Sequence, residues 1–144
     1  MVNSLCVSEE KIVSVMIKKQ IESKLSIGDK TRRMVLGQEH VDAANENKSI
    51  LDEAFQELIV EGAWGAVWSR PDLSKRERSM ITLAILASQS NWDEFDLHLR
   101  ACKNTGTSLR DVTEVLLHVG IYAGVPKANT GMKKVKNFAR KLDK

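Results

Sequence analysis

Three residues that can exchange protons or act as nucleophiles occur at four-residue steps in this 144-residue chain: Glu94, His98 and Cys102. Side chains four apart in a helix project from one face, so a carboxylate, an imidazole and a thiol would share one stripe. If the stripe faces a pocket, Glu94 could fix the imidazole tautomer or raise its pKa, and His98 would then exchange protons near neutral pH. The alternative is an exposed Glu–His pair, worth only a few tenths of a kcal/mol.

Cys102 and Cys6 are the two cysteines, and they are far apart in the chain, with no Cys-x-x-Cys pair. This spacing argues against a disulfide framework, a zinc site or a dithiol redox pair. A single cysteine is more often a small buried hydrophobe than a reactive thiol. We expect free thiols, with Cys102 retained as a possible redox residue.

Several arginines are candidates for binding an anion, because a planar guanidinium grips a carboxylate through two parallel hydrogen bonds. Arg78 directly precedes the apolar run over residues 80–86, where a charged group needs a partner or an opening. Arg70 and Arg100 are further candidates. Trp64 is expected in the core or at a subunit interface, although it could also form the wall of a pocket.

Other cofactor and partner classes have no signature in the sequence. His40 and His118 lack metal-ligand spacing, and there is no glycine-rich phosphate loop, nucleophile elbow or dinucleotide fingerprint. We therefore predict no metal and no cofactor. The basic C-terminal residues interleave with apolar ones at helical spacing, which favours a solvated helix face over a nucleic-acid site. No apolar run reaches the roughly 18 residues of a membrane span, and no signal peptide is evident, so we expect a cytoplasmic protein.

The apolar residues recur at three- and four-residue steps nearly throughout, which predicts an all-α single domain. Ser74 with Glu77 forms a capping-box pattern that should begin a helix ending near Ser88. Similar signals should begin helices at Asn91 and Ser108, and Pro126 suits the first turn of a last helix. We also expect helices over residues 9–25, 29–37 and 49–61, the last ending at a break over residues 62–65. Six to eight helices should pack as a bundle.

Read together, several segments resemble the carboxymuconolactone decarboxylase family. The family's opening is similar to residues 32–42, its Trp-Gly and Arg-Pro signature to residues 63–73, and its two central helices to residues 78–84 and 94–101. Two later segments, residues 114–118 and 121–129, follow in the same order. Several ordered motifs are far more specific than one.

The resemblance implies an all-α, alkylhydroperoxidase-like bundle that self-associates, commonly as a hexamer built as a trimer of dimers. Residues 1–29 would form an amphipathic helical extension, and residues 30–144 would form the family domain. One branch of the superfamily uses a Cys-x-x-Cys pair near a histidine. Aligning that histidine on His98 places Asn91 and Glu94 at the two cysteine positions, which favours the decarboxylase branch.

The activity implied is cofactor-free decarboxylation of 4-carboxymuconolactone, or of a related carboxylated lactone, in the β-ketoadipate pathway of aromatic catabolism. Arg78, helped by Arg70 or Arg100, would bind the substrate, and His98 set by Glu94 would deliver a proton. Trp64 would wall the site. Two alternatives remain open: a noncatalytic oligomeric binding or scaffold protein of the same fold, and a thiol-dependent peroxide reductase that uses Cys102.

Overall fold

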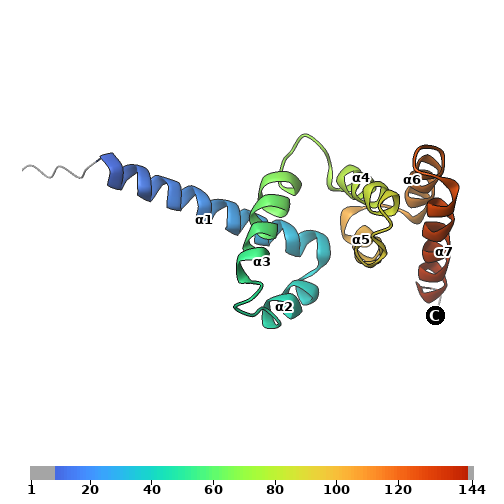
Figure 1. The fold of residues 1–144 in the computed structure, drawn as a ribbon, viewed down its shortest axis with the longest axis horizontal. Coiled ribbons are helices and arrows are strands. Elements are labelled where there is room, and N and C mark those ends of the chain that lie inside the picture. The colour runs from blue at the N-terminus through green and yellow to red at the C-terminus, as the bar shows by residue number, and fades with distance from the viewer. Residues whose placement is uncertain (1–8, 143–144) are drawn as a thin grey trace, which may run out of the picture. The chain divides into compact units, whose positions relative to one another are not determined.

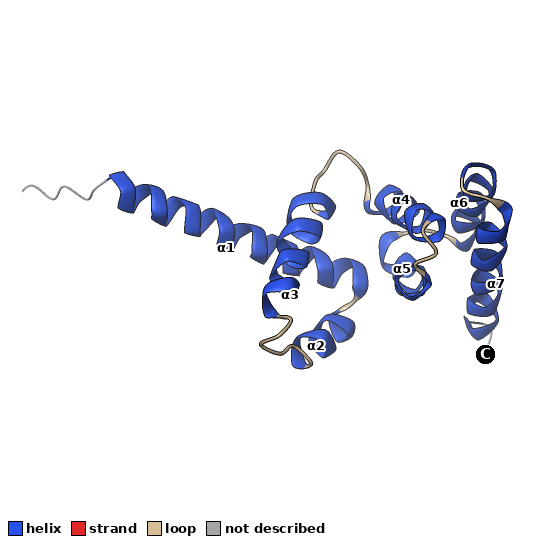
Figure 2. Cartoon of the chain, in the orientation of Figure 1, coloured by secondary structure: helices blue, strands red, loops and turns tan. Residues whose placement is uncertain are grey.

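The computed structural model describes residues 9–142, and within that range every regular element is a helix (Figures 1 and 2). The predicted all-α class and the range of six to eight helices are confirmed. The elements are α1 (Glu9–Leu36), α2 (Gln38–Glu46), α3 (Glu53–Ile59), the π-helix η1 (Val60–Trp68), α4 (Lys75–Ser88), α5 (Trp92–Thr105), α6 (Leu109–Tyr122) and α7 (Val125–Leu142).

The chain divides into two compact units. The described part of the first comprises residues 9–31 and 48–69, and the second comprises residues 32–47 with residues 70–142. The first unit therefore contains most of α1 together with α3 and η1, and the second contains α2 and α4 to α7. The expected boundary between residues 29 and 30 stays a prediction.

In the first unit, two glycines allow the backbones of α1 and η1 to touch. A Cβ added at Gly28 would overlap the carbonyl oxygen of Val60, and one added at Gly65 would overlap the carbonyl oxygen of Lys24. Two separate helices were expected over residues 9–25 and 29–37, and that prediction was wrong, because α1 runs without interruption to Leu36. Gly28 is used for close helix packing and not for a break.

The predicted break at Gly62 was also wrong. The helix instead widens at this point, and α3 continues directly into the π-helix η1. At its end the Ser69 amide donates to the Trp64 carbonyl at 3.1 Å, five residues back. Trp64 and Trp68 are buried, with ring centroids 5.2 Å apart and ring planes tilted by 32°. Such π segments are rare and often occur near functional sites.

In the second unit, the core lies among α4, α5, α6 and α7. In Figure 1, α6 and α7 run side by side, and their contact is among the most extensive between elements. Each of the four helices directs an apolar stripe inward, as amphipathic helices of a bundle do. The buried side chains are Leu83, Ala87, Phe95, Leu99, Cys102, Val112, Val115, Leu116, Val119 and Val135.

The helix starts and ends were largely predicted. Ser74 forms the capping box with Glu77 that begins α4, and Ser108 forms another with Asp111 that begins α6. Gly106, at φ 74°, ends α5 in the left-handed conformation that glycine adopts easily. Asn91 precedes α5 as expected, but its side chain makes no capping bond to the helix and donates to Gln89 instead.

Candidate functional site

The hairpin formed by α4 and α5 carries most of the predicted site residues. Glu94 is exposed in the first turn of α5, whereas His98 retains 9% of its exposure and Cys102 only 3%. The predicted stripe therefore runs from solvent into the core. It is not the fully exposed pair of the alternative interpretation.

Burial controls the protonation of His98. It lowers the pKa of the imidazole to about 4, and the negative charge of Glu94 opposes this with a smaller upward effect. Glu94 thus acts in the expected direction, but it does not hold the pKa near neutrality. The imidazole of the free chain is neutral at pH 7, so it can accept a proton or donate its single N–H.

Cys102 is a protonated thiol enclosed by its own helix and by α4. Burial raises the pKa of this thiol to about 11, while the neighbouring Ser79 hydroxyl has a smaller lowering effect. The thiol donates to the His98 carbonyl at 3.4 Å. Because the thiolate is the reactive form of cysteine, this environment disfavours the thiol-dependent peroxidase alternative.

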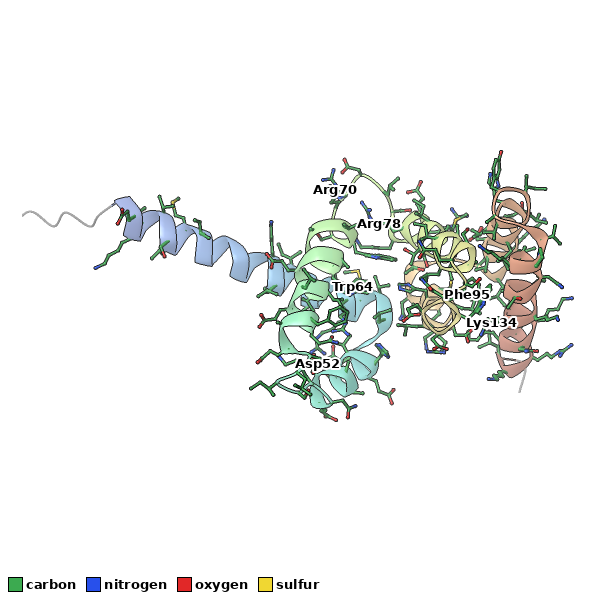
Figure 3. The ribbon with its side chains drawn as sticks, viewed as in Figure 1. Asp52, Trp64, Arg70, Arg78, Phe95 and Lys134 are labelled. Carbon is green, nitrogen blue, oxygen red and sulfur yellow. The ribbon has the colours of Figure 1, made fainter. Side chains whose placement is uncertain are left out.

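Arg78 lies in the first two turns of α4, and its Nη2 donates to the Arg70 carbonyl at 3.2 Å (Figure 3). Its Nε is buried and has no hydrogen-bond partner among the described residues. Lys75 lies one turn earlier, where burial and the positive charge of Arg78 lower the pKa of its ammonium group. Besides Arg76, which pairs with Asp111, the first turns of α4 therefore present the cationic side chains of Lys75 and Arg78 and one unsatisfied N–H.

The remaining predicted residues lie in other places. Arg70 is exposed and forms an ion pair with Asp72 at 2.9 Å. Arg100 is exposed on α5 and lines a cleft facing α2, while His98 points into the core. Trp64 belongs to the first unit, and its expected role as a pocket wall stays a prediction.

Two polar residues near the hairpin were missed from sequence. Ser79 is fully buried beside Cys102. Its burial could have been predicted from sequence, because its spacing places it on the same inward stripe of α4 as Leu83 and Ala87. Lys75 was not among the predicted site residues. Its proximity to Arg78 follows from their i, i+3 spacing.

Residues 9–142 contain neither a metal-binding cluster nor a membrane-spanning helix. No group of three or more His, Cys, Asp or Glu side chains is placed to bind a metal ion. None of the described helices combines the length and the apolar composition needed to cross a membrane.

Comparison with known proteins agrees with the motifs. The model of the carboxymuconolactone decarboxylase family matches residues 53–137. The chain is 40% identical over 111 residues to a 4-carboxymuconolactone decarboxylase of Acinetobacter baylyi, covering 77% of this chain and 83% of that protein. It is also 40% identical over 105 residues to the nitrosuccinic acid decarboxylase npaB of Metarhizium robertsii, covering 73% of each. The chain therefore belongs to the carboxymuconolactone decarboxylase family.

Proposed function

We propose that this protein removes CO₂ from a small carboxylated lactone, such as 4-carboxymuconolactone, without a cofactor. The observation that carries the proposal is the buried Nε of Arg78, which lacks a hydrogen-bond partner among the described residues and lies next to the cationic Lys75. A buried, unsatisfied guanidinium N–H is costly, and a carboxylate satisfies it with a charge-assisted bond. Arg70, whose carbonyl accepts from Arg78, is proposed as a further residue that binds the substrate carboxylate, whereas Arg100 lines a different cleft.

The enzyme class is a decarboxylase-like carboxy-lyase. Both relatives are named decarboxylases, at 40% identity over most of the chain. Their named substrates share one chemical property. In each, the electron pair left by CO₂ can delocalise into an acceptor, an unsaturated lactone carbonyl in one case and a nitro group in the other. The proposed substrate class is therefore a small polycarboxylate with such an acceptor in conjugation.

The reaction needs one proton for each CO₂ released. The carbon–carbon bond to the carboxylate breaks, and its electron pair moves through the lactone ring to the carbonyl oxygen. The resulting furanolate-like anion then takes a proton on carbon. His98 is proposed to donate this proton, with Glu94 favouring the imidazolium. A bound carboxylate would raise the pKa of His98 further. Substrate binding would therefore favour the protonated imidazolium, whereas the imidazole of the free chain is neutral at pH 7.

The catalytic form is proposed to be a cytoplasmic homohexamer that acts in aromatic catabolism. Support for self-association comes from large apolar side chains that stay exposed on α4, α6 and the start of α7. Such surfaces usually mark contacts between proteins. The exposed residues are Ile81, Ile85, Leu117, Ile121, Tyr122 and Val125. Sedimentation velocity should give about six times the 16.1 kDa chain mass, and a monomer would contradict this part of the proposal.

The activity is tested with purified protein and freshly prepared 4-carboxymuconolactone, by following CO₂ release together with lactone absorbance. Nitrosuccinate is assayed in parallel, because one relative carries that name. We expect His98→Gln and Glu94→Gln each to lower kcat, by about 10²–10⁴-fold for the histidine.

A matched control is present in the same chain. Glu114 and His118 form a second Glu–His pair at i, i+4, on α6, and both are exposed. Glu114→Gln and His118→Gln should leave turnover unchanged. Turnover of neither substrate by the assembled wild-type protein would reject the proposal in favour of a noncatalytic binding protein.

A further inference from the structure

A cleft of about 530 Å³ lies between the first turn of α2 and the exposed side of α5, within the second unit. Its polar wall includes His40 from α2 and Arg100, Lys103 and Asn104 from α5. The Asn104 side chain donates to the Val35 carbonyl at 2.9 Å, which links α5 to the end of α1 just before α2 begins. The cleft is therefore supported by a direct contact across 69 residues of sequence.

The cleft carries an excess of positive charge. Arg100 and Lys103 both line it, and neither takes part in an ion pair among residues 9–142. Glu39 is the one acidic residue in the lining. With His40 neutral the lining has a net charge of +1, and with His40 protonated it has +2.

The positive charge of the cleft affects the protonation of His40. Its pKa is lowered by partial burial, and then by the charges of Arg32 at the end of α1 and of Arg100 on α5. The charged groups near it are thus Glu39 on its own helix, Arg32, and the cations of α5. An anion in the cleft would reverse the effect of these cations on the imidazole.

The backbone adds hydrogen-bond donors to the same cleft. Gly37 precedes α2 at φ 95° and has no side chain with which to cap the helix. The first amide N–H groups of α2 therefore lack the usual side-chain acceptor, and Gly37, Gln38 and His40 all line the cleft.

We propose that this cleft binds a small carboxylate anion at a site separate from the buried His98, with Arg100 and Lys103 as the charged contacts and His40 as a proton-coupled one. Binding of a ligand in this cleft does not depend on decarboxylation, so it can be tested independently of the proposed reaction. Because the bound carboxylate favours the imidazolium, binding takes up a proton. Affinity should fall as the pH rises through the pKa of His40 in the complex.

The test uses the full chain labelled with ¹³C-histidine and titrated with succinate, with inorganic phosphate as a second probe. Imidazole resonances are followed by NMR, and His40→Gln assigns the responding signal. We expect succinate to raise the pKa of His40 while the His118 signal stays unchanged. Calorimetry in two buffers of different ionisation enthalpy should show proton uptake on binding.

One variant that removes a charge inside the cleft and one that removes a charge outside it test the proposal. Arg100→Gln should weaken succinate binding by about tenfold or more, as expected for loss of a charge-assisted pair. Lys136→Gln removes an exposed charge of α7 outside the cleft and should leave affinity unchanged. The proposal is overturned if succinate leaves His40 unmoved, if both variants bind equally, or if phosphate binds more than tenfold tighter than succinate. Loss of catalysis alone would not affect this readout.

Discussion

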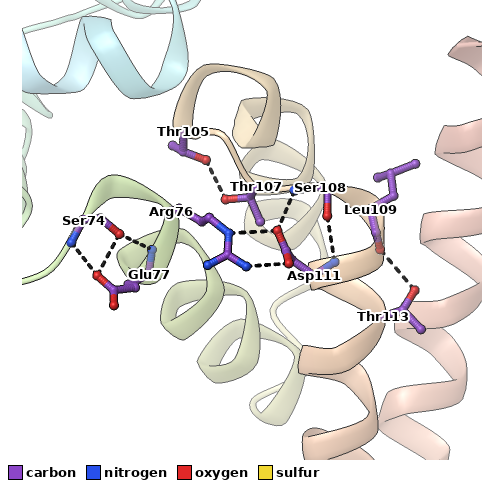
Figure 4. A network of polar contacts seen from close by, with 9 residues as sticks. All are labelled: Ser74, Arg76, Glu77, Thr105, Thr107, Ser108, Leu109, Asp111 and Thr113. Carbon is purple, nitrogen blue, oxygen red and sulfur yellow. Dashed lines mark hydrogen bonds and ion pairs between the residues drawn. The ribbon is translucent and has the colours of Figure 1, made fainter.

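The guanidinium of Arg76, in the first turn of α4, makes two hydrogen bonds to the carboxylate of Asp111, in the first turn of α6, at 2.6 and 3.0 Å (Figure 4). The same carboxylate accepts from the Ser108 amide at 2.9 Å as part of the capping box of α6. One side chain thus caps α6 and fixes α4 against it. Since α4 also carries Arg78, this pair helps to hold the candidate site in place.

Loss of the Asp111 charge should destabilise the fold in a pH-dependent way. The Arg76 pair, and then the Ser108 amide, hold the pKa of Asp111 well below its ordinary value of 3.8. A carboxyl with a depressed folded-state pKa contributes stability above the ordinary pKa and loses it as the pH falls further. Asp111→Asn should therefore lower the melting temperature at pH 7. It should also reduce the further decrease of the melting temperature as the pH falls below about 4.

Asp93→Asn is the matched control for this prediction. Asp93 also lies in the first turn of a helix and is exposed, but no arginine among the described residues pairs with it. Thermal melts from pH 7 to pH 3 should show a larger loss for Asp111→Asn. Equal losses would mean that the helix dipole, and not the Arg76 pair, accounts for the effect.

His98 should give a second pH dependence in a different window. Its folded-state pKa of about 4 lies below the unfolded value of 6.5, so the unfolded chain binds a proton first as the pH falls. The stability contribution is full above pH 6.5 and declines down to about pH 4, by on the order of 3 kcal/mol. In urea unfolding across this range, His98→Gln should flatten the slope of stability against pH. An unchanged slope in His98→Gln would show that the imidazole is not desolvated.

The sequence predicted the fold best where the signals were local. The Ser74 and Ser108 starts and the Gly106 end depend on side chains within a few residues of each helix terminus. The breaks expected between residues 25 and 29 and over residues 62–65 were wrong, because the local pattern of a glycine does not distinguish a helix break from the close helix contacts that Gly28 and Gly65 make. At Gly28 the deciding partner is Val60, 32 residues away, which no local pattern contains.

The candidate site was predicted in part for the same reason. The i, i+4 spacing placed Glu94, His98 and Cys102 on one stripe, and the structure has them on one helix. The spacing of residues in the sequence does not predict how deeply each side chain is buried, however. The burial of His98 and the proximity of Ser79 to Cys102 depend on tertiary packing, so the prediction from spacing overestimated the effect of Glu94 on the pKa of His98.

Arg78 should affect substrate binding more than folding. Arg78→Gln should lower kcat/KM for the carboxylated substrate by about 10- to 100-fold, mainly through KM, because charge-assisted hydrogen bonds are worth about 1.5–3 kcal/mol. Arg78→Lys keeps the charge but loses the planar fork, and should recover only part of the loss. Arg110→Gln, an exposed arginine of α6, is the control. Steady-state kinetics that give equal constants for Arg78→Gln and Arg110→Gln would exclude the anion-binding role.

Cys102 should be chemically inert and dispensable for turnover. With a thiol pKa raised to about 11 by burial, little thiolate exists at pH 7. In a Cys6→Ser background, iodoacetamide should label native Cys102 far more slowly than the urea-unfolded chain, as measured by mass spectrometry. Cys102→Ala should keep decarboxylation within a few-fold of wild type and should show no change in peroxide consumption. Rapid native labelling, with peroxide consumption lost in Cys102→Ala, would instead support the reductase alternative.

Gly28 and Gly62 provide a test of how α1 is held in the first unit. A Cβ at Gly28 would overlap the Val60 carbonyl, which belongs to helical backbone and cannot rotate away, so Gly28→Ala should destabilise by about 1–3 kcal/mol. A Cβ at Gly62 meets no atom within 4 Å, so Gly62→Ala should be neutral or stabilising by up to about 1 kcal/mol, because alanine favours helix. Hydrogen exchange by mass spectrometry would locate the effect, with faster exchange expected in α1 and η1 for Gly28→Ala alone. If both variants exchanged like wild type, the close packing of α1 on η1 would not be a stabilising contact in solution, and the uninterrupted course of α1 would need another cause.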